Sequence, residues 1–318
     1  MSKSILISPG TATRLLDRKR QDSALGRLVG AGAAIATVEL ANTLQTPVLV
    51  IATDPRQADQ LVEEIRWFSD GTLPVMDFVE WETLPYDSFS PHQDIISDRL
   101  KVLGALPDLH RSAVIISASS LFQRLPPKNY VSARTLHLQC GQTLNHEKFL
   151  DSLTACGYLR VPQVEEHGEF AVRGSLLDVF PMGTDDPIRI DFFDDEIESL
   201  RSFDRDTQLS GDKVDKFNIL PAREIPLDQP DIQSFRRRYR ERFEGRPSAS
   251  HVYRDVSDGI AHGGIEYYLP LFFDETSSFL DYLPDDSVVM VPHAIDSLLT
   301  QSWSEIEERY ELYSHDPE

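Results

Sequence analysis

The strongest constraint on the fold is an alternation of short apolar runs with amphipathic segments between about Arg27 and Leu125. Two runs have the length and composition expected of buried strands, Val48–Ala52 and Ala113–Ala118, and Val75–Val79 is a further strand candidate between them. Parallel strands need crossover connections, and the segments between these runs are long enough to form helices. The sequence therefore predicts an α/β fold with a parallel, doubly wound sheet.

The segment after the first run shows why helices are expected between the strands. Asp54 can cap a helix N-terminus, and Pro55 is favourable in a first helical turn. Apolar residues then recur at helical spacing, at Ala58, Leu61, Ile65 and Phe68. Further helices are predicted in three segments, 32–45, 95–106 and 120–125. A later run, Ser287–Val291, is predicted to be a buried strand that returns to the same sheet.

The pattern changes from about Asn129, where short alternating segments with turn signals begin. This α+β insertion contains a predicted helix at 146–157 and extends to roughly Asn218. A linker then leads to mostly helical sequence that ends in an amphipathic helix. We therefore expect an α/β domain at 1–128, an inserted α+β domain at 129–219 and a helical segment with the returning strand at 220–318. We also expect the sequence to be part of a longer protein.

The beginning of the first predicted helix resembles a phosphate-binding loop that has lost its chemistry. Gly30 and Gly32 supply a tight turn, but Ala33 and Ala34 stand where a lysine and a serine or threonine are required. The run Ser287–Val291 is followed by Pro292 rather than by magnesium-binding carboxylates. We therefore predict a degenerate P-loop NTPase-like domain that does not hydrolyse ATP. No catalytic residue, cofactor or metal is expected.

One strand of the insertion has two unlike faces. Ile188, Ile190 and Phe192 point to one side, and Arg189, Asp191 and Phe193 point to the other. The first face is typical of a core, whereas an aromatic ring among charges is typical of a recognition surface. Arg173 precedes the turn at 181–187, so it shares this face with Arg189 and Phe193 if the flanking strands pair. The alternative is that Phe193 covers a neighbouring domain and the arginines pair with Asp178 and Asp191.

Composition limits the possible partners. The chain has 31 basic and 52 acidic residues, a net charge of −21, and this disfavours unaided tight binding to DNA. The segment Arg236–Arg242 could form a basic nucleic-acid-binding helix. We favour an alternative in which the aromatic residues of this helix lie in the core and its arginines lie in solvent. With two separated cysteines and no evident signal sequence, a cytoplasmic protein without a membrane partner is expected.

Two other groups of polar residues suggest sites but have simpler explanations. Glu165, Glu166, His167 and Glu169 could be read as metal ligands. Side chains at strand or loop spacing diverge, so a solvated edge is the favoured interpretation. His92 and Asp94 could suggest acid–base chemistry, but Asp94 can simply begin the following helix.

Four long motifs resemble the N-terminal region of the bacterial transcription-repair coupling factor family (Mfd). They are WETLPYDSFSPHQDIISDRL, EHGEFAVRGSLLDVFPMG, IRIDFFDDEIESLRSFD and GIEYYLPLFF, at 81–100, 166–183, 188–204 and 264–273. The same region is similar in architecture to the excision-repair subunit UvrB, in which domains 1a and 1b bracket an inserted domain 2. Unlike UvrB, this sequence lacks a working phosphate loop and a long aromatic hairpin for damaged DNA.

The resemblance implies a non-catalytic adaptor that recruits the damage-recognition protein UvrA where RNA polymerase has stalled. The residues that the family uses for UvrA fall on Arg173, Arg189 and Phe193. In the full-length protein, the resemblance also implies ATP-dependent translocation on double-stranded DNA, contact with RNA polymerase and masking by a C-terminal domain. The alternative function is a nucleic-acid-binding or nucleotide-dependent UvrB-like helicase module.

Overall fold

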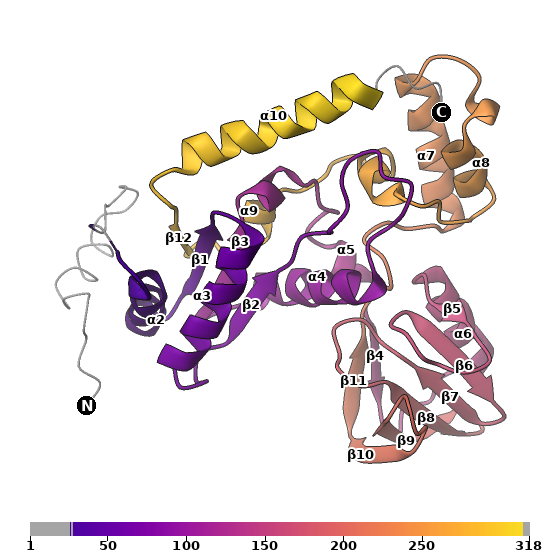
Figure 1. The fold of residues 1–318 in the computed structure, drawn as a ribbon. Helices are drawn as coiled ribbons and strands as arrows, with labels where there is room; N and C mark the ends of the chain where they lie inside the picture. Colours follow the sequence, from indigo (N-terminus) through magenta and orange to yellow (C-terminus); the bar gives the residue numbers. More distant parts are fainter. Residues whose placement is uncertain (1–25, 27, 314–318) are drawn as a thin grey trace. The chain divides into compact units, whose positions relative to one another are not determined.

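The computed structural model describes residue 26 and residues 28–313, which group into two compact units (Figure 1). Unit 1 contains the described residues up to Glu80 together with 105–123 and 279–308. Unit 2 contains 81–104, 124–278 and the described residues from Arg309 onward. The three-domain division expected above stays a prediction.

Unit 1 is built on a parallel four-stranded sheet, which confirms the predicted α/β class. The strand order is β12-β1-β3-β2, with bounds Val288–Met290, Pro47–Ala52, Ser112–Ser117 and Val75–Phe78. Strands β1 and β3 are buried at every position because each has a neighbour on both sides. The predicted strand at Ser287–Val291 does return to this sheet, as β12. It is not a buried strand, because it lies at the sheet edge, where Val289 is 43% exposed.

Helices of unit 1 pack on this sheet largely where the sequence predicts them. They are α2 (Gly32–Leu44), α3 (Pro55–Phe68), the 3₁₀ turns η1 (Leu106–Asp108) and η2 (Ser119–Phe122), and α9 (Phe279–Tyr282). The Asp54 side chain accepts the Gln57 N–H at 2.9 Å, so the predicted N-cap of α3 is confirmed. The short helix predicted at 120–125 is instead a 3₁₀ turn. Helix α10 (Ile295–Tyr313) has residues in both units.

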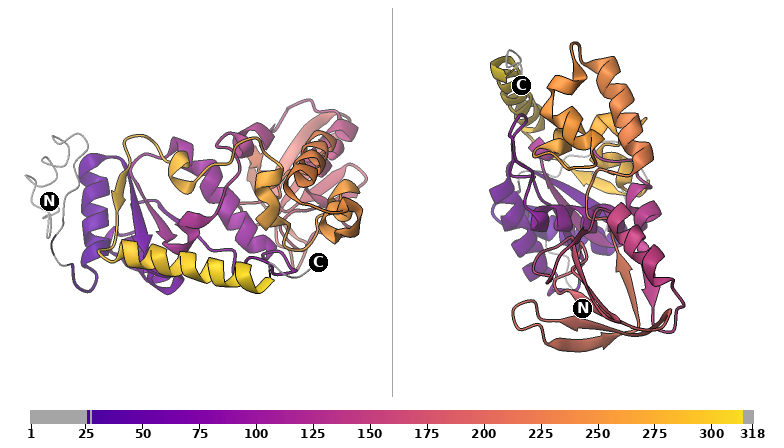
Figure 2. Two further views of the ribbon diagram at one scale, coloured as in Figure 1. Left: turned by 90° about the horizontal axis from the view of Figure 1, so that it is seen from above. Right: turned by 90° about the vertical axis from the view of Figure 1, so that its right-hand side faces the viewer.

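Unit 2 contains a six-stranded sheet of order β10-β9-β8-β7-β6-β5 (Figures 1 and 2). From β5 to β10 the strands are Leu159–Arg160, Glu169–Arg173, Leu176–Val179, Ile188–Phe193, Glu196–Phe203 and Ser210–Val214. A second pair of strands, β4 (Leu136–Gln139) and β11 (Lys216–Ile219), forms an antiparallel ribbon. The helix predicted at 146–157 is confirmed as α6 (His146–Ala155).

Unit 2 contains further helices besides α6. They are α4 (Gln93–Ala105, in unit 2 up to Gly104), α5 (Tyr130–Arg134), α7 (Gln229–Arg242), α8 (His251–Ser257), η3 (Pro247–Ala249) and η4 (Ile265–Leu271). Phe235 of α7 is fully buried and its ring packs 5.5 Å from that of Tyr239, as expected for a core-facing helix. The expectation that all aromatic residues of this segment lie in the core is wrong for Phe243, which is 44% exposed because the helix ends at Arg242. A buried ion pair joins Arg99 to Glu224, with Nε to Oε1 at 2.5 Å.

Candidate protein-docking face on the six-stranded sheet

Strand β8 has the two faces that its sequence predicts. Ile188, Ile190 and Phe192 are buried, Arg189 and Asp191 are half-buried, and Phe193 is exposed. Helix α6 covers the apolar face, and the ring of Phe149 lies 6.4 Å from that of Phe192. The alternation of buried and exposed side chains along β8 therefore reflects the packing of α6 on its apolar face.

Arg173 lies on the polar face of the sheet, although its strand is not the direct neighbour of β8 that the sequence suggested. The segment before the 181–187 turn is a hairpin of two strands, β6 and β7, which Gly174 joins at φ +68°. Strand β7 therefore lies between β6 and β8. Arg173 pairs with Leu176, which in turn pairs with Asp191 of β8. Because paired residues in a sheet share a face, Arg173 lies on the same side as Arg189.

We call the residues on this side the docking face, and they are Arg173, Leu176, Arg189, Asp191 and Phe193. Phe193 is 69% exposed and pairs with Glu196 at the turn that closes the β8–β9 hairpin. The turn consists of Asp194 and Asp195, and Asp194 has φ +53° there. A β-bulge between Asp191 and Phe192 shifts the register there.

Arg189 is held firmly by its neighbours. Its Nε and Nη2 donate to the two carboxylate oxygens of Asp178 at 2.7 and 2.9 Å. The guanidinium carbon lies 4.7 Å from the centre of the Phe203 ring. The hydrogen bond to Asp178 raises the pKa of Arg189, although burial opposes this change. The pairing with Asp178, considered above as an alternative, is therefore present for this arginine.

Arg173 is more loosely held. It is exposed, and its Nη2 donates to the carbonyl oxygen of Pro162 at 3.3 Å. The two predicted arginines therefore differ in their contacts, since one has a paired, half-buried guanidinium and the other is exposed at a strand end. A flexible exposed arginine can still reorient towards a partner carboxylate.

The other end of the same sheet face is closed by a small cluster. Ala171, Phe180 and Phe203 are buried there, with Val161 and Val164 packed against them. Beside this cluster, Arg189 lies opposite Arg201 in the strand register, and Arg201 lies opposite Lys213 of the edge strand β10. Sequence reasoning missed Leu176, Arg201 and Lys213 because their position depends on strand pairing. The alternation within each strand was the only available signal.

The residues of the predicted nucleotide loop lie at the start of α2. Gly30 has φ +57°, and Gly32 is the first residue of the helix. Ala34 is fully buried and Ala33 packs against the core of unit 1. Neither methyl group supplies the charge or the hydroxyl group with which a phosphate-binding loop holds phosphate and magnesium.

The polar residues considered as metal ligands have structural partners. Glu169 accepts the backbone N–H groups of Glu165 and Glu166 at 2.8 and 2.9 Å. The Nδ1 atom of His167 lies 2.7 Å from Asp94. Among residue 26 and residues 28–313, no group of three or more His, Cys, Asp or Glu side chains is arranged to hold a metal ion.

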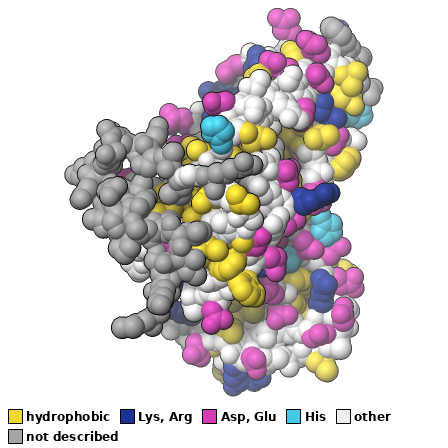
Figure 3. Space-filling view, turned by 60° about the vertical axis from the view of Figure 1, so that its left-hand side comes forward, with side chains coloured by type: hydrophobic (Ala, Val, Ile, Leu, Met, Phe, Trp, Pro, Cys, Tyr) yellow, Lys and Arg dark blue, Asp and Glu magenta, His cyan; other side chains and the backbone are white. Residues whose placement is uncertain are grey.

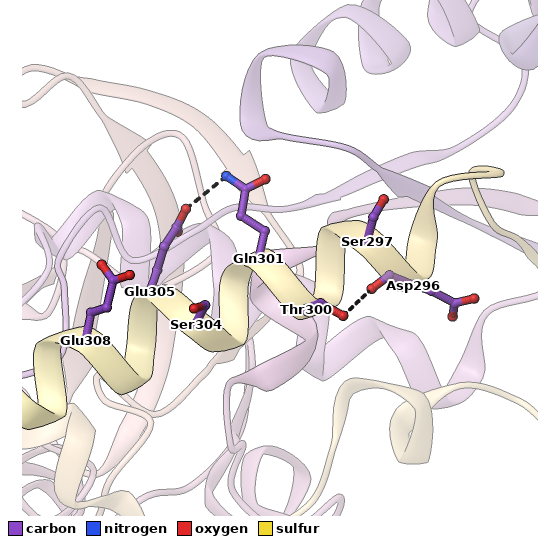
Figure 4. Close-up of a pocket in the computed structure, with 7 residues that line it drawn as sticks. All are labelled: Asp296, Ser297, Thr300, Gln301, Ser304, Glu305 and Glu308. Carbon is purple, nitrogen blue, oxygen red and sulfur yellow. Dashed lines mark hydrogen bonds between the residues drawn. The ribbon is translucent and has the colours of Figure 1, made fainter.

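The chain has more acidic than basic side chains, 52 against 31. Figure 3 shows Asp and Glu side chains spread over the visible face, among scattered Lys and Arg. Figure 4 shows a hollow along α10 whose lining residues are Asp296, Ser297, Thr300, Gln301, Ser304, Glu305 and Glu308. All of these side chains come from one helix, so no second element supplies groups that converge on a ligand. None of the described helices is long and apolar enough to span a membrane.

Comparisons with known proteins match both the region of the six-stranded sheet and the chain as a whole. Residues 136–225 match the family described as the UvrB interaction domain. The chain is 42% identical over 294 residues to the transcription-repair-coupling factor of Escherichia coli, covering 92% of this chain and 25% of that protein. It is 40% identical over 316 residues to the Haemophilus influenzae protein of the same name, covering 99% and 27%.

The chain thus spans about a quarter of the length of these curated relatives. A third relative, the transcription-repair-coupling factor of Myxococcus xanthus, is 31% identical over 297 residues, covering 88% of this chain and 25% of that protein. The chain belongs with the transcription-repair coupling factors, in which it corresponds to the N-terminal region, and it carries a UvrB interaction domain.

Proposed function

We propose that this region is a non-catalytic adaptor that recruits UvrA through the docking face in transcription-coupled excision repair. The observation that carries the proposal is the 69% exposure of Phe193 on the same sheet face as Arg173 and Arg189. All three residues lie within the matched UvrB interaction domain. Aromatic and arginine side chains supply most of the binding energy in many protein interfaces.

The proposal is tested by measuring UvrA affinity for the intact chain and for three variants, Arg173→Ala, Arg189→Ala and Phe193→Ala. Each variant is expected to weaken binding by about 10-fold or more, which corresponds to about 1.4 kcal/mol. Phe89→Ala is the matched control, since Phe89 is another exposed phenylalanine of unit 2 at 57% exposure. Unchanged affinity after replacement of all three residues would reject the docking face.

The absence of nucleotide chemistry is a separate part of the proposal. Ala33 and Ala34 offer neither the charge nor the hydroxyl group that triphosphate binding with magnesium requires. We therefore expect magnesium–ATP to leave the melting temperature of this region unchanged, because a ligand that binds only the native state would raise it. The proposed parent protein supplies ATP-dependent translocation and the contacts with DNA and RNA polymerase through its other parts.

The contacts of α7 support an adaptor over a DNA-binding module. Arg236 Nε donates to the hydroxyl of Tyr253 at 3.3 Å, and Arg238 Nη1 donates to the carbonyl of Leu271 at 3.0 Å. Arg238 also pairs with Asp274. These arginines are therefore engaged within unit 2 rather than directed only to solvent. Salt-dependent binding of the isolated region to DNA would favour the alternative function.

The proposed setting is the cytoplasm, where Cys140 and Cys156 remain free thiols. We propose further that in the full-length protein a C-terminal domain masks the docking face until the motor engages. Competition between UvrA and the remainder of the protein for the wild-type face, lost in Phe193→Ala, would support this arrangement.

A further inference from the structure

The turn between β9 and β10 carries an exposed leucine on a hydrogen-bonded loop. Leu209 is 70% exposed, and we call residues 204–210 the Leu209 loop. The Asp204 carboxylate accepts the Thr207 N–H at 2.7 Å, and the Asp204 N–H donates to the Leu209 carbonyl at 3.0 Å. Gln208 has φ +60°, a conformation that a non-glycine residue holds only when its surroundings enforce it.

The surroundings that hold this loop are supplied by Arg189. Its Nη1 donates to the Gln208 carbonyl at 3.2 Å and to the Ser210 hydroxyl at 3.1 Å. These two bonds bracket Leu209 in the sequence. Gln208 Nε2 adds a bond to the Val164 carbonyl at 3.4 Å, which attaches the loop to the cluster that closes this end of the sheet face.

The remaining donors of Arg189 also point into the protein. Two of them bind Asp178, whose side chain is only 3% exposed, and the side chain of Arg189 itself is 16% exposed. A guanidinium satisfied in this way has little donor capacity left for a partner. Its fixed fork geometry is instead well suited to hold a strand and a loop in one arrangement.

We propose that Leu209 is a second apolar contact of the docking face, and that Arg189 acts by positioning the Leu209 loop rather than by contacting the partner. This inference rests on the proposed function of the docking face. Arg189 and Phe193 are four residues apart on β8, roughly 13 Å in an extended strand. One interface of ordinary size, about 800 Å² on each partner, covers both ends of such a strand.

The partner surface that fits this arrangement has two separated apolar pockets, one for Phe193 and one for Leu209. On the β6 side of these pockets it offers a carboxylate or carbonyl group to the exposed Arg173. Preorganisation of the loop by Asp178 and Arg189 lowers the entropy lost on binding.

The binding test uses the intact chain and purified UvrA, with Leu209→Ser, Arg189→Lys and the double variant. Lysine keeps the positive charge, but its single nitrogen cannot hold the Leu209 loop and both oxygens of Asp178 as the guanidinium group does. Leu209→Ser is expected to weaken binding by about 5-fold to 10-fold. The double variant is expected to bind no more weakly than Arg189→Lys alone, since the positioning and the contact act as one unit. Arg173→Ala combined with Leu209→Ser should instead multiply the two losses.

A second measurement follows amide hydrogen exchange of the Leu209 loop in the free chain. Arg189→Lys is expected to speed exchange of the Gln208 amide by about 10-fold, because the local opening of the loop becomes easier. Arg173→Lys is the matched control and should leave this rate unchanged. Unchanged exchange in Arg189→Lys would overturn the positioning role.

The outcomes separate this inference from the proposed function. If Phe193→Ala weakens UvrA binding and Leu209→Ser does not, the docking face stands and the second contact is wrong. If the losses of Arg189→Lys and Leu209→Ser multiply fully, Arg189 contacts the partner itself and the positioning role is wrong. If none of the variants, Phe193→Ala included, changes UvrA binding, the proposed function and this inference both fail.

Discussion

Asp178 and Arg189 lie directly opposite each other on the neighbouring strands β7 and β8, joined by two hydrogen bonds of 2.7 and 2.9 Å. The carboxylate is almost fully buried, whereas the guanidinium extends to the Leu209 loop. Desolvation weakens the net benefit of such a pair, but both charges are well satisfied by direct hydrogen bonds. The pair therefore connects the interior of the sheet to its proposed docking face.

Removal of the Asp178 carboxylate is expected to be costly. Asp178→Ala leaves Arg189 partly buried without its partner, and we expect a loss of about 2 kcal/mol in the free energy of unfolding. Urea denaturation of the intact chain measures this change. Asp191→Ala is the control on the same face, because the Asp191 carboxylate accepts only a long hydrogen bond from the Ser175 hydroxyl, at 3.5 Å, among the described residues. Equal stability of the two variants would contradict a structural role for the Asp178 pair.

A carboxyl group at the start of α7 is expected to make stability depend on pH. Burial raises the pKa of Asp231 to about 6, and a hydrogen bond and the negative charge from Asp228 add to this effect. Arg134, which contacts Asp231 at 2.7 Å, acts in the opposite direction. In the unfolded chain the group has a pKa of about 3.9.

Between pH 4 and pH 6 the native state therefore binds more protons at Asp231 than the unfolded state does. The contribution of this residue to the free energy of unfolding is largest below pH 4 and is lost as the pH rises through about 6. We expect Asp231→Asn to reduce the decline in stability across this window by about 1 kcal/mol, after allowance for solvent screening. Denaturation curves at several pH values measure how the free energy of unfolding changes with pH. An identical change in both proteins would contradict the assignment of this pH dependence to Asp231.

Two glycines with similar backbone conformations should tolerate alanine very differently. Gly264 has φ +77°, and an added Cβ would lie 2.3 Å from the carbonyl oxygen of Asp87. Gly174 has φ +68°, but nothing lies within 4 Å of the corresponding position. Gly174→Ala should therefore cost only the backbone strain of about 1 kcal/mol, whereas Gly264→Ala should cost roughly 3 kcal/mol or more. Thermal and urea denaturation of both variants test this order.

Much of the local structure could be predicted from the sequence because it depends on neighbouring residues. The apolar runs of β1 and β3, the Asp54 cap and the alternation along β8 are confirmed. The edge position of β12 could not be predicted in the same way. Its apolar composition is that of a buried strand, but exposure depends on how many strands flank it, and β12 has only β1 beside it.

The candidate site also combines features that the sequence predicts with features that only the fold determines. By itself, the sequence determined which side chains of β8 share a face, because alternation is a property of a single extended chain. Only the tertiary structure decided that β7 lies between Arg173 and Arg189, and that Arg189 binds Asp178 and the Leu209 loop. Those relationships join residues that are distant in sequence, and they arise from strand register and packing rather than from local preference.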